Sequence, residues 1–230
     1  MPIDVLVVED DPVLREVLTL HLQGAGYDVR PVSSGDEALD ACAVAAPDVV
    51  VLDLSLPGKS GLEVCTALRA SFDPTPGVLI VTARASEADV MLGFDAGADD
   101  YVVKPCRPRE VVARVAALLR RVRPSVGGRD IIRRGELSVD VDAMRARFGA
   151  TALELTPTEF ALLAALARAP EVVHARKALL ASIWSSSHEG YLRNVDCHVT
   201  RLRRKLEAAG ATGPLIETVH GVGYRWSGAA

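Results

Sequence analysis

The chain has 230 residues, 49% of them hydrophobic, and a formal net charge of −4, so it has room for one large domain or two small ones. No apolar run approaches the ~18 residues of a membrane helix, and the acidic start MPIDVLVVEDD lacks the basic leader of a secretory signal. The four cysteines form no C-x-x-C pair, which argues against a zinc site or a redox pair. We therefore expect a cytoplasmic protein without membrane contact.

The charge is distributed unevenly along the chain. Residues 1–122 contain 11 Lys and Arg against 19 Asp and Glu, whereas residues 123–230 contain 15 against 11. This asymmetry fits a basic domain that binds a polyanion, and it fits uneven surface charge equally well. The segment RPSVGGR between the halves has the composition of a linker. The sequence thus predicts domains at 1–122 and 130–228, joined by a linker at 123–129.

Short apolar runs alternate with amphipathic segments in the first half. The apolar runs lie at 3–8, 28–32, 48–52, 77–81 and 101–103, and the amphipathic segments at 12–24, 35–45, 60–71, 86–97 and 107–121. Strand and helix alternating about five times predict an α/β domain whose parallel sheet carries helices on both faces. Continuous Val, Ile and Leu runs are typical of strands that are buried on both faces.

Polar residues follow four of these runs, at the point where each run ends. Glu9, Asp10 and Asp11 follow the first, Asp53 the third, Thr82 the fourth and Lys104 the fifth. Sites in open parallel sheets form at this edge. Neighbouring carboxylates favour Mg²⁺, and an ammonium and a hydroxyl beside them suit a transferred phosphoryl group with Asp53 as nucleophile. Asp11, directly before Pro12, is more simply explained as a helix N-cap.

Residues 1–121 resemble a response-regulator receiver domain, in VVEDDP, VVLDLSLPGKSG, IVTARA, GADDYVVKP and RPREVVARVAALLRR. The resemblance implies a flavodoxin-like, doubly wound (βα)5 fold and phosphorylation of Asp53 by a partner histidine kinase. It implies Mg²⁺ bound by Asp10, Asp53 and the main-chain carbonyl of Ser55, with Glu9 acting through water. Thr82 and Tyr101 would form the switch pair, and Lys104 would contact the phosphate. Cys106 departs from the family's usual Phe.

The second half begins with strand-like pieces at 131–156, followed by three helical patterns. The first opens with Thr156 as N-cap, Pro157 in the first turn and Glu159 three residues after the cap, as in a capping box. The second covers 175–184 and the third 192–207. The segment 215–226, LIETVHGVGYRW, has the pattern of a β-hairpin. Helices followed by a hairpin predict a winged helix-turn-helix.

The third helical pattern has one apolar stripe and a basic opposite side. At 100° per residue, the core stripe consists of Val195, Val199, Leu202 and Leu206. The remaining face carries five Lys or Arg against Asp196 and Glu207, which suits the DNA major groove. A solvated surface helix is the alternative for this segment alone.

Residues 130–227 resemble the OmpR/PhoB-type DNA-binding domain, in LTPTEF, RNVDCHVTRLRRKL and TVHGVGYR. The resemblance implies an α+β domain with a four-stranded sheet before the helices, a recognition helix at 192–207 and a wing at 218–224. It implies DNA contacts from Arg193, Asn194, Cys197, His198, Thr200, Arg201, Arg203, Arg204, Thr218 and His220. His220 stands where the family often has Arg, and the loop 185–191 is the candidate contact with RNA polymerase.

The family's dimer face implies a further set of residues. These are Asp99, Asp100, Glu110, Arg114 and Arg121, with Asp100–Arg114 and Asp99–Arg121 as cross-subunit pairs in a homodimer formed on activation. Each exposed pair contributes only about 0.2–1 kcal/mol, so a network is required. Val90 or Met91 stands where the family usually has a basic residue, which removes the usual partner of Glu110.

We therefore expect a two-component response regulator and transcription factor, switched by phosphorylation of Asp53, that binds tandem half-sites on double-stranded DNA. It would not be an enzyme, beyond assisting its own phosphorylation and dephosphorylation. The acidic loop EDDP excludes a nucleotide or flavin domain, and Ser55 stands where an aspartyl phosphatase needs a second acid. The alternative that remains open is a phosphorylation-independent DNA-binding regulator whose receiver serves as a dimerisation or docking module.

Overall fold

The computed structural model describes residues 3–72, 75–122, 130–184 and 192–227. The chain divides into two compact units, one ending at Val122 and the other starting at Arg123. Two predicted segments, the linker at 123–129 and the loop at 185–191, lie outside the described residues. Within the described ranges, no helix combines the length and the apolar character needed to cross a membrane.

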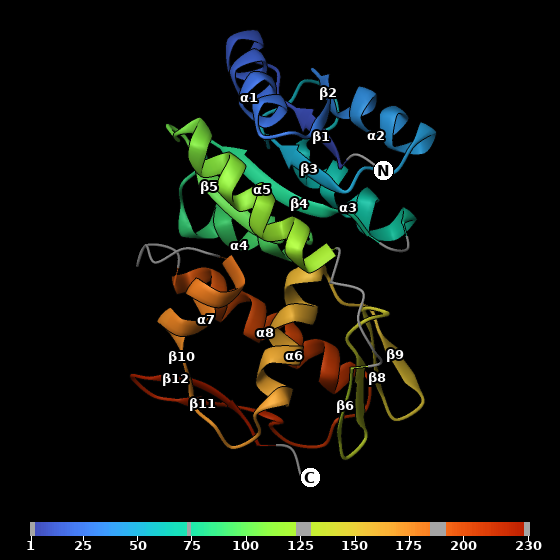
Figure 1. Ribbon diagram of the computed structural model, residues 1–230, viewed down its shortest axis with the longest axis vertical. Helices are drawn as coiled ribbons and strands as arrows, with labels where there is room; N and C mark the ends of the chain where they lie inside the picture. Colours follow the sequence, from blue (N-terminus) through green and yellow to red (C-terminus); the bar gives the residue numbers. More distant parts are fainter. Residues whose placement is uncertain (1–2, 73–74, 123–129, 185–191, 228–230) are drawn as a thin grey trace. The chain divides into compact units, whose positions relative to one another are not determined.

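The first unit is a parallel five-stranded sheet in the order β2-β1-β3-β4-β5, with five alternating helices (Figure 1). Its strands are β1 (Asp4–Val8), β2 (Asp28–Val32), β3 (Val49–Leu52), β4 (Gly77–Thr82) and β5 (Asp100–Val103). Its helices are α1 (Pro12–Gly24), α2 (Gly35–Val44), α3 (Gly61–Ser71), α4 (Glu87–Asp95) and α5 (Pro108–Val122). This confirms the predicted α/β fold, with element boundaries within about two residues of those predicted.

Burial of the central strands explains their uniform apolar sequences. All four residues of β3 and all six of β4 are buried, as expected for strands covered on both faces. The register aligns the strand ends, because Val8 pairs with Leu52 and Leu52 pairs with Ile80. Strand order reverses where β1 separates β2 from β3, which is where open α/β sheets bind ligands. The next residues of β1 and β3 are Glu9 and Asp53.

The second unit joins two antiparallel sheets to three helices. The four-stranded sheet contains β6 (Ile131–Arg134), β7 (Leu137–Asp140), β8 (Arg145–Phe148) and β9 (Thr151–Leu153), and the helices are α6 (Pro157–Arg168), α7 (Arg176–Trp184) and α8 (Leu192–Ala208). The other sheet has the order β10-β12-β11, from β10 (His174–Ala175), β11 (Ile216–Val219) and β12 (Gly223–Trp226). The predicted winged helix fold is therefore confirmed, whereas the two-residue strand β10 was not foreseen.

The predicted core stripe of the long helix is also confirmed. Val195, Val199, Leu202 and Leu206 are at most 2% exposed. They join a core that includes Trp184 and Trp226. At the start of α6, Thr156 and Glu159 form the predicted capping box, and Pro157 occupies the first turn.

Candidate functional site

The acidic residues at the sheet edge meet on one lysine. Lys104 Nζ lies 2.6 Å from Asp53 Oδ2 and 2.9 and 2.7 Å from the two carboxylate oxygens of Glu9. Asp53 and Glu9 are 4% and 2% exposed, so both charges are nearly removed from solvent. Buried carboxylates require such a counter-charge. The predicted convergence of these three residues is thus present.

The Asp53 carboxylate has a further contact within its own loop. The Ser55 amide donates to Asp53 Oδ1 at 3.0 Å, and the buried Thr82 side chain, at the end of β4, also helps to lower the pKa of Asp53. Gly61 closes the loop, because a Cβ at that position would lie 2.1 Å from the Asp53 carbonyl oxygen. Gly61, the last residue of LPGKSG, therefore allows α3 to begin directly against Asp53, the candidate phosphoacceptor.

The two buried acids have opposite protonation tendencies. Burial raises the pKa of the Asp53 carboxyl, but the hydrogen bond from Lys104, followed by that from the Ser55 amide, outweighs it and lowers the pKa below its ordinary value. Burial also raises the pKa of Glu9, and there it prevails over Lys104. Lys104 itself has a raised pKa, because its two carboxylate partners outweigh burial. The surroundings therefore favour the ionised form of Asp53 and disfavour that of Glu9.

The carboxylates present fit a hard cation. One oxygen each of Glu9, Asp10 and Asp53 lies within 4.8 Å of the others, and Asp10 is exposed. An all-oxygen set with an open side is what Mg²⁺ prefers. Arg15, which sequence reasoning missed, donates to the carbonyls of Glu9 and Asp10 at 2.6 and 3.1 Å. No sequence motif identifies Arg15, since these contacts depend on the direction in which α1 runs after the end of β1.

Asp11 is a helix cap, as expected. Its side chain accepts hydrogen bonds from the amides of Val13 and Leu14, at 2.8 and 3.0 Å, and Pro12 begins α1. These two hydrogen bonds lower the pKa of Asp11. Asp11 therefore caps α1 and does not join the group of Glu9, Asp53 and Lys104.

The two predicted switch residues are both buried. Thr82 is fully buried and Tyr101 is 2% exposed, and the Tyr101 hydroxyl donates to the Arg84 carbonyl at 2.8 Å. Burial raises the pKa of Tyr101 to about 12. Cys106, the departure after Lys104-Pro105, is half-buried and packs against the core of the first unit. An apolar thiol there replaces part of the packing that an aromatic ring would supply.

Four of the predicted dimer-face residues have ion-pair partners within the chain, and the predicted cross-subunit pairing stays a prediction. Arg114 Nη1 lies 2.6 Å from Asp100 Oδ2 and Arg114 Nη2 lies 3.1 Å from Glu110. Asp99 pairs with Arg69 at 2.7 Å and accepts from the Val78 amide at 2.9 Å. Arg114 lies one helical turn after Glu110, so α5 presents it to β5 and Glu110 together. Glu110, which lacks the family's usual basic partner, is therefore paired with Arg114 of its own helix.

The basic helix α8 leaves only some of its predicted DNA contacts exposed. Arg193, Thr200, Arg204 and, on the hairpin turn, His220 are exposed. Asn194, Cys197 and His198 are buried, and the His198 ring lies 5.5 Å from that of Trp184.

Two predicted DNA-binding arginines contact protein groups in this structure. Arg201 Nε lies 3.1 Å from Glu159 of α6. Arg203 donates to the Ile216 carbonyl at 2.9 and 2.7 Å and to the Thr218 hydroxyl at 2.8 Å. The helical wheel places Arg201 opposite the core stripe and Arg203 beside that face, but it takes no account of neighbouring elements that cover the flanks of α8.

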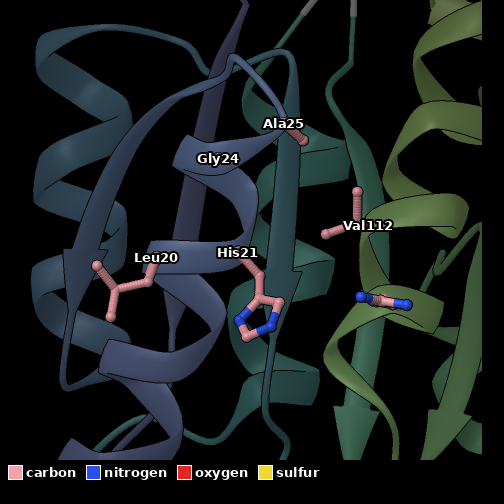
Figure 2. A pocket seen from close by; sticks show the side chains of 6 residues that line it. Leu20, His21, Gly24, Ala25 and Val112 are labelled. Atoms are coloured by element: carbon pink, nitrogen blue, oxygen red, sulfur yellow. The ribbon is translucent and has the colours of Figure 1, made fainter.

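A shallow pocket of about 430 Å³ lies between α1 and α5 (Figure 2). It is lined by Leu20, His21, Gly24, Ala25, Arg109 and Val112. None of the predicted site residues lines it, so the chemistry indicated by the sequence belongs to the sheet edge.

Known proteins share both units of this chain. Residues 5–116 match the response regulator receiver domain, and residues 150–226 match the family described as transcriptional regulatory protein, C terminal. The DNA-binding response regulator MtrA of Mycolicibacterium smegmatis is 43% identical over 96% of this chain and 95% of its own length. The transcriptional regulatory protein BaeR of Escherichia coli is 40% identical over 98% and 95%.

A solved structure extends the likeness to the fold of the whole chain. The response regulator DrrB of Thermotoga maritima, described as an OmpR/PhoB homologue, has a TM-score of 0.54 and 32% identity over 99% of this chain and 100% of its own. The acidic group of Glu9, Asp10 and Asp53 is typical of a receiver's phosphorylation site. The chain therefore belongs to the OmpR/PhoB family of two-component response regulators, which are DNA-binding transcription factors rather than enzymes.

Proposed function

We propose that Asp53 accepts a phosphoryl group from a partner histidine kinase and that this modification controls DNA binding. The observation that carries the proposal is the Lys104 ammonium, which bridges Asp53 and Glu9 at hydrogen-bond distance. An Asp53 carboxylate oxygen attacks phosphorus, an O–P bond forms, and the P–N bond to the kinase histidine breaks with its electron pair passing to the imidazole. Lys104 and Thr82 contact the transferred oxygens and stabilise their charge.

Mg²⁺ is the cofactor that the acidic group would hold. Glu9, Asp10 and Asp53 offer carboxylate oxygens, and we assign the Ser55 main-chain carbonyl as a further ligand. When bound, the ion neutralises charge on the phosphoryl oxygens. Asp10 is the exposed member of the set, so it is accessible to a hydrated cation.

Phosphorylation of Asp53 would be read out by Thr82 and Tyr101. Thr82 is buried at the end of β4 and helps to lower the pKa of Asp53, and the Tyr101 hydroxyl donates to the carbonyl of Arg84, two residues after Thr82. We propose that their rearrangement allows two receivers to pair through α4, β5 and α5 and brings two DNA-binding units onto tandem half-sites. Pairing would require Asp99, Asp100 and Arg114 to exchange or share their intrachain partners. Arg121 would belong to the same face.

The DNA-binding surface would centre on the exposed residues of α8 and the wing, Arg193, Thr200, Arg204 and His220. Arginines in the major groove contact guanine edges or phosphates. Contacts from Asn194, Cys197, His198, Arg201, Arg203 and Thr218 would require side chains that are buried or hydrogen-bonded to protein to be released. The predicted contact with RNA polymerase through 185–191 stays a prediction.

The neighbouring acids Asp10 and Asp11 provide a matched test of the magnesium site. The full chain is incubated with acetyl phosphate in Mg²⁺ or in EDTA, and the added phosphoryl group is measured by intact mass. Asp10→Asn should raise the Mg²⁺ concentration needed for half-maximal phosphorylation by about tenfold or more, since metal ligands contribute at that scale. Asp11→Asn, which alters only a helix cap, should leave that concentration unchanged.

Equal phosphorylation in Mg²⁺ and in EDTA, or an equal response of the two variants, would contradict the assigned metal site. Absence of any phosphorylation in the folded wild type would favour the other candidate function. In that case the chain would be a phosphorylation-independent DNA-binding regulator whose receiver serves as a dimerisation or docking module. The half-buried Cys106, two residues after Lys104, is the observation that favours this candidate.

A further inference from the structure

Two helices of this chain begin with the same capping box, but their glutamates have different surroundings. Ser60 and Glu63 cap α3, and Thr156 and Glu159 cap α6. The Glu63 carboxylate is exposed, and its hydrogen bonds with Ser60 lower its pKa. Glu159 is fully buried. A cap alone gives no reason to bury a charge, because an exposed glutamate caps equally well.

The reason for burial lies on helix α8, which packs against α6 (Figure 1). Glu159 Oε2 accepts from Lys205 Nζ at 2.6 Å and from the Thr156 amide at 2.9 Å. Glu159 Oε1 faces Arg201 Nε at 3.1 Å, an ion-pair contact without hydrogen-bond alignment. Arg201 and Lys205 are four residues apart, so they occupy one flank of α8. One carboxylate therefore forms ion pairs with two of the helix's cations.

Arg201 is incompletely satisfied by this arrangement. Its side chain is 13% exposed, and its Nη1 is buried without a hydrogen-bond partner in the part of the chain that the structure describes. A guanidinium has five N–H donors and prefers a two-pronged anionic partner such as a phosphate. Glu159 thus competes with DNA for a cation that it holds with suboptimal geometry.

We propose that Glu159 is the internal counter-ion of the DNA-binding helix, holding Arg201 and Lys205 away from DNA phosphates. Sequence-independent affinity for DNA rises with the number of phosphates that protein cations neutralise. Two sequestered cations lower that background affinity, whereas base contacts from exposed residues are unaffected. Glu159 is then a positioning residue that increases the ratio of specific to non-specific binding.

The test compares Glu159→Gln with Glu63→Gln in the full chain. Glutamine retains both capping boxes and removes one negative charge in each case. Affinity for a short duplex of arbitrary sequence is measured by fluorescence anisotropy between about 50 and 200 mM NaCl, where each phosphate contact contributes about 0.9 to the slope of log affinity against log salt.

We expect Glu159→Gln to steepen the slope by about 0.9 or more, so that the affinity ratio between these two salt concentrations grows about threefold. Glu63→Gln should leave the slope unchanged. A slope for Glu159→Gln equal to that of Glu63→Gln would overturn the proposal and reduce Glu159 to a helix cap. The proposal rests on DNA binding by this chain, and failure of the wild type to bind any duplex would instead count against that function.

A second pair of variants tests the same point without altering the cap. If Glu159 keeps Arg201 off the phosphates, Arg201→Gln leaves the slope unchanged, whereas Arg204→Gln, at an exposed position of the same helix, lowers it by about 0.9. Equal losses in the two variants would show that Arg201 contacts phosphate despite Glu159. Circular dichroism of every variant confirms that the fold is retained.

Discussion

The Lys104 ammonium hydrogen-bonds both Asp53 and Glu9, but the pKa values of the two carboxyls shift in opposite directions. Burial dominates at Glu9, whose pKa is raised, while hydrogen bonds dominate at Asp53, whose pKa is lowered. A nucleophile must be ionised, and the surroundings of Asp53 favour its ionised form. The sequence predicts that these side chains meet, because strand ends share an edge. It does not predict which of the two acids has the lowered pKa, since that depends on hydrogen-bond partners.

The pKa of Glu9 gives a pH-dependent prediction for stability without divalent metal. The native state raises this pKa above the ordinary 4.5, so it binds the proton more tightly than the unfolded state. That contribution to the free energy of unfolding is complete below the ordinary pKa and is lost as pH rises through the native pKa. We expect the wild type, relative to Glu9→Gln, to lose stability as pH rises from 4.5 toward neutrality.

Urea denaturation in EDTA over a pH series measures this difference. Glu63→Gln provides the control of opposite sign, because the native state lowers the pKa of Glu63. Relative to that variant, the wild type should lose stability as the pH falls below 4.5. The stability difference between wild type and Glu9→Gln could instead stay constant with pH, or change with pH in the same direction as the difference for Glu63→Gln. Either result would show that hydrogen bonds from Lys104 outweigh burial at Glu9.

At the scale of elements, the position of Asp53 depends on how closely α3 approaches β3. Ser60 caps α3, and Gly61 lies against the main chain of Asp53 and Leu54. The Pro-Gly-Lys-Ser-Gly composition predicts a loop at this point. The contact that makes Gly61 necessary depends on the tertiary approach of α3 and is not visible in a single sequence.

We expect Gly61→Ala to destabilise the receiver by about 1–3 kcal/mol, the usual cost of overpacking, because the new Cβ meets backbone. It should also slow phosphorylation, since relief of the clash displaces Asp53. Chemical denaturation and acetyl phosphate labelling measure the two effects. Gly24→Ala is the matched control, at the end of α1 where a Cβ meets nothing within 4 Å. Equal behaviour of the two variants would be evidence against the close approach.

The wing depends on α8 in a comparable way. Arg203 joins α8 to β11 through the Ile216 carbonyl and the Thr218 hydroxyl, and its guanidinium lies 5.7 Å from the centre of the Tyr224 ring. Arg176 lies 4.7 Å from the same ring and pairs with Asp196 of α8 at 2.8 Å. The hairpin pattern predicts the wing, but these cross-element contacts follow from packing.

Removal of the Arg203 guanidinium leaves the Ile216 carbonyl without its partner. We expect Arg203→Met to lower the free energy of unfolding by about 1–3 kcal/mol, measured through the fluorescence of Trp184 and Trp226. Arg204→Met, which changes an exposed residue of the same helix, should alter stability by at most about 0.5 kcal/mol. If both variants unfold alike, the connection between α8 and β11 contributes little.

At the scale of the whole molecule, the acidic half and the basic half correspond to a receiver and a DNA-binding unit. Alternating apolar runs and helical patterns were sufficient to predict both folds. Partners of charged residues were harder to predict, as Asp100 and Arg114 show, because an ion pair within one chain and one between chains have the same sequence. Packing of α5 against the sheet buries both side chains and brings them together within the chain.

The most direct test of the account is the affinity of the full chain for duplex DNA that it selects from its own genome, measured before and after acetyl phosphate with Mg²⁺. Asp53→Asn is measured alongside, and size analysis of the same samples reports pairing. We expect treatment to raise the affinity of the wild type and to yield dimers, while the affinity and the size of Asp53→Asn stay unchanged. A phosphorylated wild type with unaltered affinity would contradict the claim that Asp53 is the switch.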